Sequence, residues 1–316
     1  MSTVAFLFPG QGSHRIGMGV SLAQQHAAAR EVFAEVDEAL GQALFRLMSE
    51  GSEDELTLTA NAQPALMAVS MAAARVLEAE AGRPIAALGH YLAGHSLGEY
   101  SALCAASSLG LADTARVLRA RGEAMQSAVP SNAGAMAAIL GLEFDQILAL
   151  VVEAERETGE ACDIANDNAE GQVVISGTAA AVAKASSSAQ AAGAKRVVPL
   201  KVSAPFHSRL MLPAAEAMAE VLAEISVRAP DLPLVSNVEA SPNQAAERVR
   251  PLLIEQVTAR VRWRETLGFL VAEGVDTFVE LGSGKVLTGL AKRAARGAHC
   301  LSFGEAEGLD ALLATL

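Results

Sequence analysis

Residues 91–100 read YLAGHSLGEY, in which Ser96 is flanked two positions away on each side by Gly94 and Gly98. This G-x-S-x-G pattern is typical of a nucleophile elbow, a cramped turn between a strand and a helix that holds a serine hydroxyl above the edge of a sheet. A Cβ at either flanking position would collide with the neighbouring turn, so both positions need glycine. The alternative is a chance match in a chain with 26 glycines.

The residues around the pattern favour the elbow over a chance match. Residues 85–93 are mostly apolar and have the length of a strand, whereas apolar and small residues recur after the pattern at helical spacing. The geometry also aims the backbone amide of Leu97, at the start of this helix, toward the place where an oxyanion would form. Ser96 is therefore the candidate nucleophile, and Leu97 supplies a candidate oxyanion-hole donor.

The composition indicates a globular protein with a sizeable core. Of 316 residues, 51% are hydrophobic, 19% are charged and 4% are aromatic, which excludes a disordered chain. A net charge of −12 argues against nucleic acid as the main partner. The three cysteines have no close spacing, so neither a metal cluster nor a disulfide framework is expected. Without a basic leader or an apolar run of spanning length, the sequence predicts a cytoplasmic protein with no membrane partner.

The order of predicted elements indicates an α/β fold with a parallel sheet. Residues 4–8 form an apolar run followed by Pro-Gly-Gln-Gly-Ser at 9–13, which predicts a buried strand that ends in a loop at the ligand-binding edge of the sheet. Later strands are expected at 234–238, 277–281 and 300–303. Helices are expected at 20–27, 28–48, 61–81, 113–126 with Asp113 as N-cap, 213–226, 243–258, 263–273 and 285–296.

A second pattern begins near Gly134. It predicts a strand, helix, strand, strand, helix and strand, at 135–140, 143–158, 162–165, 172–176, 178–192 and 196–200, with a turn at Asn166-Asp167-Asn168. This order is that of a ferredoxin-like unit. The chain is therefore expected to form a large α/β catalytic domain from residues 1–130 and 204–316, with a small ferredoxin-like domain inserted at 131–203.

A serine hydroxyl needs a general base, most often histidine, to act as a nucleophile at neutral pH. Of six histidines, His207 is the strongest candidate, because it lies in a non-regular segment where the chain re-enters the large domain. The alternative is a histidine that caps the following helix. His95 should point away from Ser96, and His14 lies where it could touch a ligand. No acidic third member of a triad can be placed, and a backbone carbonyl that orients the histidine would leave a Ser-His dyad.

Arg121 lies one helix after the elbow, within LRARGEAMQ at 118–126. A buried guanidinium at this place would hold a carboxylate through two parallel hydrogen bonds. The alternative is a solvated helix arginine, like Arg116 and Arg119. The residues by themselves favour the solvated arginine.

Five segments spread along the chain form a pattern when they are read together. They are FPGQGS at 8–13, GHSLGEY at 94–100, Arg121-Gly122, FHS at 206–208 and GSGKVLTGL at 282–290. This pattern strongly resembles the malonyl-CoA:acyl carrier protein transacylase family. Matching segments run from Val4 to Lys292, so the resemblance covers nearly the whole chain. His14 is a departure, because many members carry glutamine there.

The resemblance implies a role for each matching residue. In that family the serine matching Ser96 takes the malonyl group as an ester, and the histidine matching His207 is its base. The arginine matching Arg121 binds the malonyl carboxylate. Backbone amides at the positions of Gln11 and Leu97 form the oxyanion hole.

The resemblance also bears on the fold, the base and the acyl group. It implies an α/β-hydrolase-like core with a ferredoxin-like small domain. The family's histidine is oriented by a main-chain carbonyl, and residues 261–263 resemble the segment that supplies it. Members with phenylalanine at the position of Phe206 generally use malonyl, whereas related acyltransferases that accept a methyl branch tend to have a smaller residue.

We therefore expect an acyltransferase that moves a malonyl group from malonyl-CoA to the phosphopantetheine thiol of acyl carrier protein in fatty-acid synthesis, with no cofactor or metal. One rival is a serine hydrolase or thioesterase, which has no use for Arg121. Another is a non-catalytic carrier-protein binding module, in which Ser96 would not be acylated. The candidates for docking anionic partners are Lys195, Arg196, Lys285, Lys292, Arg293 and Arg296.

Overall fold

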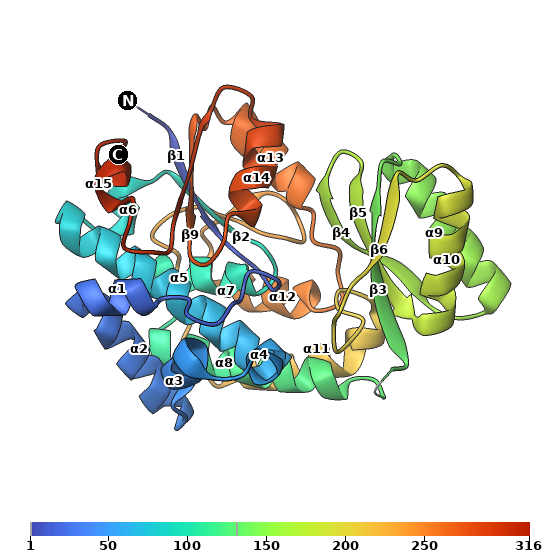
Figure 1. Ribbon diagram of the computed structural model, residues 1–316, viewed down its shortest axis with the longest axis horizontal. Helices are drawn as coiled ribbons and strands as arrows, with labels where there is room; N and C mark the ends of the chain where they lie inside the picture. The colour runs from blue at the N-terminus through green and yellow to red at the C-terminus, as the bar shows by residue number, and fades with distance from the viewer. Residues whose placement is uncertain (1, 131) are drawn as a thin grey trace.

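The computed structural model describes residues 2–130 and 132–316, which fold around two β-sheets (Figure 1). The larger sheet has the strand order β10-β9-β1-β2-β7-β8, and its neighbours are parallel except for β7 and β8. The parallel core expected from the sequence is confirmed. The strands span His299–Phe303 (β10), Thr277–Leu281 (β9), Val4–Phe8 (β1), Tyr91–Gly94 (β2), Leu234–Val235 (β7) and Pro242–Asn243 (β8).

Strand β1 lies between β9 and β2, and all five of its residues are buried. Phe8 at its end is in register with Gly94 at the end of β2. The loop after β1 and the turn after β2 therefore leave the same edge of the sheet, where open parallel sheets bind their ligands. A hydrogen bond from the His95 amide to the Phe8 carbonyl oxygen (3.0 Å) joins the two turns.

Alternate residues of β1 belong to separate cores, because successive side chains of a strand point to opposite faces. Phe6 and Phe8 pack in the larger core, whereas Ala5 and Leu7 pack in a second one.

Among the described residues, none of the helices has the length and hydrophobicity of a transmembrane segment. Outside the small sheet the helices are α1 (Val20–Gln25), α2 (Ala27–Leu40), α3 (Leu44–Glu50), α4 (Glu53–Thr57), α5 (Thr59–Ala81), α6 (Ile85–Leu88), α7 (Leu97–Ala105), α8 (Leu111–Ser127), α11 (Leu212–Ala223), α12 (Ala246–Gln256), α13 (Trp263–Ala272), α14 (Val286–Ala294) and α15 (Leu309–Leu313), with a 3₁₀ turn at Arg209–Met211.

The second sheet is antiparallel, with the order β4-β5-β3-β6, and lies on the right in Figure 1. This order, with one helix after β3 and another after β5, is that of a ferredoxin-like fold, and it encloses a core of its own. The domain boundary expected at residue 131 lies outside the described residues. The elements are β3 (Gly134–Leu140), α9 (Phe144–Thr158), β4 (Cys162–Ala169), β5 (Gln172–Thr178), α10 (Ala179–Ala191) and β6 (Arg196–Pro199).

Two predicted elements, one strand and one helix, were wrong. Residues 85–93 are not one strand, since α6 occupies 85–88 and β2 begins only at Tyr91. A short apolar run fits a buried helix as well as a strand, so its composition could not separate them. The segment 28–48 is not one helix either, because Gly41 adopts φ 58° and ends α2 before α3 begins.

Two expectations about caps and turns were also wrong. Helix α8 begins at Leu111 after Gly110, so Asp113 is not its N-cap but lies in its first turn, where it pairs with Arg116 at 2.6 Å. Residues 166–168 are not a turn, because they continue β4 through two irregularities in its pairing with β5.

The end of β4 joins the small sheet to the larger unit. The Val261 amide donates to the Ala165 carbonyl oxygen (2.8 Å), and the Asp167 amide donates to the Val261 carbonyl oxygen (2.9 Å). The buried Asp167 carboxylate also pairs with Arg264 of α13 at 2.8 Å. Residues 166–168 are thus held beside the loop between α12 and α13, at the ligand-binding edge of the larger sheet.

Candidate active site

Ser96 occupies the turn between β2 and α7 in a conformation that few residues adopt. Its φ and ψ are 54° and −111°, where a residue with a Cβ is strained. A Cβ added at Gly94 would lie 1.9 Å from the Gly98 carbonyl oxygen, and one at Gly98 would lie 2.1 Å from the Phe8 carbonyl oxygen. These two positions therefore accept only glycine, as the elbow pattern predicts.

The side chain of Asn237 is hydrogen-bonded to the backbone of the elbow. Its Oδ1 accepts a hydrogen bond from the Ser96 amide (2.7 Å), and its Nδ2 donates to the Gly94 carbonyl oxygen (2.6 Å). The strained turn leaves these two backbone groups without a partner in either the strand or the helix, and buried backbone groups need one. Asn237 is itself fully buried. It therefore offsets part of the cost of the turn.

His207 lies against Ser96, with 2.7 Å between its Nε2 and the Ser96 Oγ. On the other side of the ring, Nδ1 lies 2.9 Å from the Gln256 carbonyl oxygen and 3.1 Å from that of Ala259. A carbonyl oxygen can only accept, so Nδ1 carries the proton and Nε2 is free to accept the Ser96 proton. The orienting carbonyls come from residues 256 and 259 and not from 261–263, because the chain turns toward the ring where α12 ends.

Burial controls the protonation state of His207. The ring is 3% exposed, and its burial together with the neighbouring Arg121 cation lowers the pKa of His207 to about 3. The two backbone carbonyls oppose this shift but do not cancel it. The imidazole is therefore neutral, and able to accept a proton, throughout the physiological range.

We expect the rate of Ser96 acylation to stay nearly level between pH 8 and 5. If the base were a solvated histidine with a pKa of about 6.5, the rate of Ser96 acylation would instead fall tenfold for each pH unit below that value. Unfolded His207 takes up a proton below about pH 6.5 while the folded form does not, so the free energy of unfolding falls as the pH drops. Circular dichroism at each pH keeps the two effects apart. A tenfold decline per unit below pH 6.5 in folded protein would contradict the prediction.

Arg121 is buried in α8 and faces the serine. It is 1% exposed, its Nη1 donates to Gln63 Oε1 (2.9 Å), and its Nη2 donates to Gln256 Oε1 (2.8 Å) and Ser96 Oγ (3.3 Å). No carboxylate of the described residues forms an ion pair with it, and its Nε has no hydrogen-bond partner among them. A buried cation without a counter-ion is costly, so the site is suited to an anionic ligand.

A cavity of about 330 Å³ opens onto these groups. Ser96, His207 and Arg121 share it with Gln11 of the first loop and with Phe206, which is 8% exposed. Its apolar walls suit a short acyl chain, and its one buried cation suits a terminal carboxylate. The remaining lining residues are Gly12, His14, Thr57, Gln63, His95, Met125, Met136, Asn166, Leu200, Lys201 and Val202.

The structure places the two expected oxyanion-hole residues at the same edge of the sheet. Leu97 is the first residue of α7, and the first amides of a helix have no acceptor within it. Gln11 lines the cavity, and its side chain donates to Thr59 Oγ1 (3.4 Å). His95 points away from Ser96, as expected, toward Asn168 Oδ1 at 2.9 Å.

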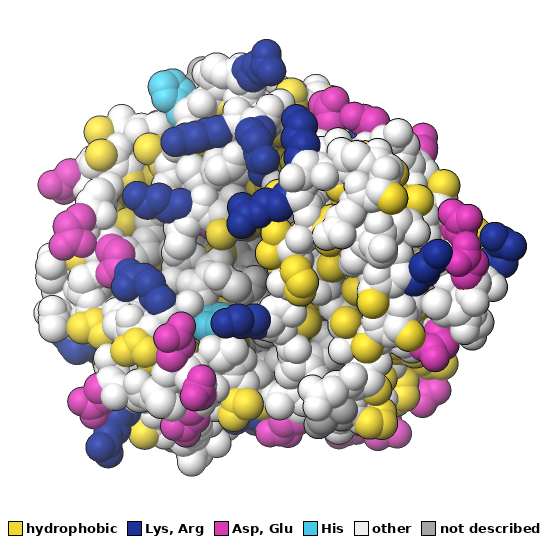
Figure 2. All heavy atoms as spheres, turned by 45° about the vertical axis from the view of Figure 1, so that its right-hand side comes forward, with side chains coloured by type: hydrophobic (Ala, Val, Ile, Leu, Met, Phe, Trp, Pro, Cys, Tyr) yellow, Lys and Arg dark blue, Asp and Glu magenta, His cyan; other side chains and the backbone are white. Residues whose placement is uncertain are grey.

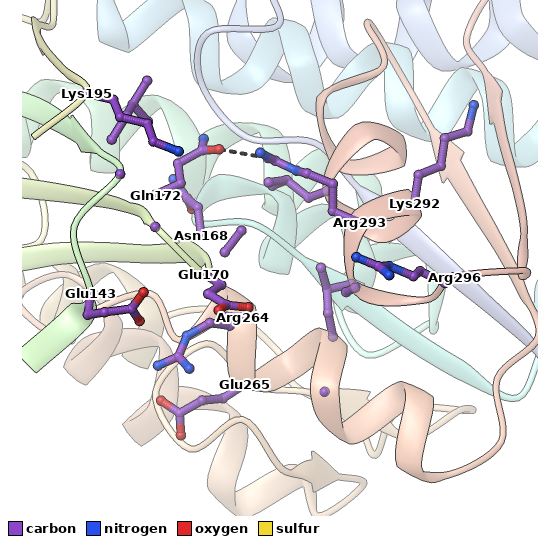
Figure 3. A pocket seen from close by; sticks show the side chains of 18 residues that line it. Glu143, Asn168, Glu170, Gln172, Lys195, Arg264, Glu265, Lys292, Arg293 and Arg296 are labelled. Carbon is purple, nitrogen blue, oxygen red and sulfur yellow. Dashed lines mark hydrogen bonds between the residues drawn. The ribbon is translucent and has the colours of Figure 1, made fainter.

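A larger hollow of about 1260 Å³ lies between the small sheet and α13 and α14. Figure 2 shows Lys and Arg side chains gathered around a hollow on this face. Figure 3 shows Lys195, Lys292, Arg293 and Arg296 in this cavity, where Arg293 donates to Gln172 Oε1 (2.7 Å). None of these four cations is in an ion pair with a described residue, although three glutamates also line the hollow. Of the six expected docking residues, Arg196 and Lys285 do not line it.

Asn166 and Asn168 lie close together in the sequence at the end of β4, and each lines one of the two cavities. Asn166 lines the smaller one, whereas Asn168 lines the larger one and its Oδ1 accepts a hydrogen bond from His95 Nε2, beside Ser96. Among the described residues, no three His, Cys, Asp or Glu side chains lie close enough to hold a metal ion.

Comparison with known proteins identifies the family. A family model described as an acyl transferase domain matches residues 5–306. The chain belongs to the acyl transferase family. It is 46% identical to the malonyl CoA-acyl carrier protein transacylase of Bacillus subtilis, over 100% of this chain and 98% of that relative.

Solved structures of similar proteins support membership of the acyl transferase family. The acyl-carrier-protein-S-malonyltransferase from Bartonella henselae has a TM-score of 0.96 and 53% identity over 99% of both chains. A malonyl-transacylase solved in complex with its type II PKS acyl-carrier protein has a TM-score of 0.94 and 40% identity over 100% of both chains.

The sequence did not predict four polar residues of this acyl transferase site. Asn237 and Gln256 reach Ser96, Gln63 reaches Arg121, and Glu99 is buried beneath the elbow. Asn237 lies at the end of the predicted strand 234–238, at the ligand-binding edge of the sheet, which is a signal that could have found it. Gln256 lies near the end of an ordinary helix, and nothing in its surroundings marks it.

Proposed function

We propose that the protein transfers a malonyl group from malonyl-CoA to the phosphopantetheine thiol of acyl carrier protein, through an ester on Ser96. The observation that carries this is Arg121, a buried cation that forms no ion pair with any described carboxylate and lies 3.3 Å from the Ser96 Oγ. A malonyl thioester bears a carboxylate two carbons from its reacting carbonyl and can therefore engage both groups. The similar proteins are named as malonyl transferases that act with acyl carrier protein, which supports the same reaction.

The first half-reaction forms the ester. The Ser96 Oγ bonds to the thioester carbonyl carbon while its proton moves to His207 Nε2, and the carbonyl electron pair moves onto oxygen. The backbone amides of Gln11 and Leu97 stabilise this oxyanion, each contributing about 2.7–4 kcal/mol to the lowering of the barrier. Collapse re-forms the carbonyl, breaks the C–S bond and expels the coenzyme A thiolate, which takes the proton from His207.

The second half-reaction repeats these steps with the carrier thiol. His207 accepts the thiol proton, the sulfur bonds to the ester carbonyl carbon, and collapse breaks the bond to Ser96 Oγ, which recovers its proton. Both half-reactions use one oxyanion hole and one base. Coenzyme A leaves before the carrier protein binds, so the kinetics should be ping-pong.

Mass spectrometry after brief exposure to malonyl-CoA tests the proposal. We expect the wild-type protein to gain one malonyl group on Ser96 and to lose it on addition of carrier protein, with Ser96→Ala as the unreactive control. Rapid release of free malonate without carrier protein would favour a serine hydrolase or thioesterase. An unmodified wild-type Ser96 would favour a non-catalytic carrier-protein binding module.

We expect reversal of the charges at Lys195, Lys292, Arg293 and Arg296 to raise the KM for carrier protein and to flatten its dependence on salt. Acyl carrier proteins and the coenzyme A phosphates are anionic, and exposed charges act over roughly a Debye length of 10 Å at 0.1 M salt. Acylation of Ser96 at saturating malonyl-CoA should change little. Reversal of four exposed charges that do not line this hollow, at Arg30, Arg46, Arg83 and Arg228, is the matched control. An unchanged salt dependence would remove these residues from carrier docking.

We expect Phe206→Ser to shift the preference toward methylmalonyl-CoA by roughly one to two decades. A methyl branch on the acyl group would compete with the ring for volume in the cavity, and overpacking by a methyl costs about 1–3 kcal/mol. The measurement is kcat/KM for malonyl-CoA and methylmalonyl-CoA side by side. If both rates drop by one factor, the ring serves to anchor the loop that carries His207.

A further inference from the structure

A buried carboxylate lies beneath the elbow, and the mechanism above does not use it. Glu99, in the first turn of α7, is 1% exposed. Its Oε2 accepts hydrogen bonds from the Gln256 side-chain Nε2 (2.8 Å) and from the backbone N–H of Asn237 (3.2 Å). A buried carboxylate is costly unless its partners repay the cost, which suggests that these two contacts have a purpose beyond packing.

Gln256 links the three groups that meet the substrate. Its Oε1 accepts from Arg121 Nη2 (2.8 Å), its Nε2 donates to the Ser96 carbonyl oxygen (2.9 Å), and its backbone carbonyl accepts from His207 Nδ1 (2.9 Å). The side chain is fully buried. A change in its position would therefore be transmitted to the cation, the serine and the base together.

The orientation of the Gln256 amide decides whether it can hold Arg121. The two ends of a side-chain amide differ, since the NH₂ group donates and the oxygen accepts. Reversed, the amide would bring its NH₂ group against the guanidinium, donor against donor. Acceptors at the NH₂ end prevent this reversal, and they are Glu99 Oε2 and the Ser96 carbonyl oxygen. Of these two acceptors, only Glu99 Oε2 belongs to a side chain.

We propose that Glu99 is a positioning residue that acts through Gln256: its carboxyl oxygen fixes the Gln256 amide so that Arg121 is held for the acyl carboxylate. The proposal rests on the function proposed above. Burial raises the pKa of Glu99 to about 7, although Gln256, Asn237 and Arg121 all favour the charged form. Both protonation states leave an acceptor oxygen at this position, so the link to Gln256 does not depend on the charge.

The test compares Glu99→Leu with Glu99→Gln. Leucine removes the acceptor, whereas glutamine keeps an oxygen for both Gln256 and Asn237. We expect Glu99→Leu to lower the ratio of kcat/KM for malonyl-CoA over acetyl-CoA about tenfold or more, chiefly through the KM for malonyl-CoA. Glu99→Gln should stay within about threefold of wild type, as expected when an acceptor to Gln256 is retained. In an Arg121→Ala background, Glu99→Leu should change the ratio no further.

Glu280→Leu is the matched control. Glu280 is also a buried carboxylate, but it accepts from Thr288 at the start of α14 and not from the site. The Glu280→Leu variant should have a lower melting temperature than wild type and an unchanged ratio of kcat/KM for malonyl-CoA over acetyl-CoA. If Glu99→Leu does not fold, Glu99→Met, whose unbranched side chain is closer to glutamate in shape, removes the same carboxyl oxygen and should lower the ratio equally.

Three outcomes would overturn the proposal. They are an unchanged ratio in folded Glu99→Leu, a loss in Glu99→Gln as large as in Glu99→Leu, and an equal loss in Glu280→Leu. Wild-type protein is assayed in parallel, because failure of wild-type Ser96 to accept malonyl would instead reject the proposed function. The two failures are thus distinguishable.

Discussion

In the His207→Ala variant, acylation of Ser96 by malonyl-CoA should fall by about 10⁴- to 10⁶-fold, the range found when the nucleophile's base is removed from related serine sites. His207 Nε2 lies 2.7 Å from the Ser96 Oγ, and Nδ1 is fixed by two carbonyl oxygens. The His207 ring therefore accepts the serine proton without help from a second side chain. No second base is bonded to Ser96 Oγ among the described residues, since its other partner is the Arg121 cation.

Rapid-quench mass spectrometry of the Ser96 ester measures this rate without the carrier protein. His299→Ala is the control, because His299 is exposed at the start of β10. The His207→Ala variant must also be folded at the assay temperature. Thermal unfolding checks this, since the ring is buried and its loss leaves a small cavity that lowers stability. A rate that drops less than about a hundredfold in folded protein would mean that another group accepts the proton.

In the Arg121→Ala variant, the preference for malonyl over acetyl should fall by about 10²- to 10³-fold. Truncating one partner of a buried, hydrogen-bonded charge pair costs about 2–5 kcal/mol, and here the lost partner is the counter-ion of the acyl carboxylate. Transfer of acetyl should survive, or rise relative to malonyl, because a neutral acyl group makes no such pair.

The comparison of malonyl-CoA with acetyl-CoA in one assay decides whether Arg121 binds substrate or only supports the fold. Arg121→Lys is the informative second variant, since lysine keeps the charge but lacks the two-pronged geometry, and an intermediate ratio is expected. Equal losses with both substrates would make Arg121 structural. In that case the assignment of malonyl as the acyl group would lose its main support.

Much of the candidate site could be predicted because its rules are local. Ser96 and its two flanking glycines follow from the sterics of one turn, which depend on a few neighbouring residues. Arg121 is different, since the sequence could not separate a buried arginine from a solvated one like Arg116, which is half-exposed in its pair with Asp113. Burial depends on what packs over a helix face, and that is set by segments far away in the chain.

The sequence alone also misjudged features that depend on distant partners. The apolar residues 85–88 form a helix because β2 begins at Tyr91, where pairing with Ala5 starts. Residues 166–168 look like a turn, but hydrogen bonds to Val261 keep them extended. In both places, long-range pairing overrode a local preference.

By itself, the sequence determined the parallel α/β core, the ferredoxin-like order of the small sheet, the elbow at Ser96 and the identity of the histidine beside it. The first three follow from periodicity or glycine sterics, which depend on neighbouring residues, whereas His207 was selected by its place after the small domain and by the family resemblance. Only the tertiary structure decided that the carbonyls of Gln256 and Ala259 orient His207 and that Asn237 holds the elbow. The physical reason is that every residue carries a backbone carbonyl, so the carbonyls that orient His207 leave no mark in the sequence, and the predicted strand that ends near Asn237 does not show which backbone groups its side chain binds.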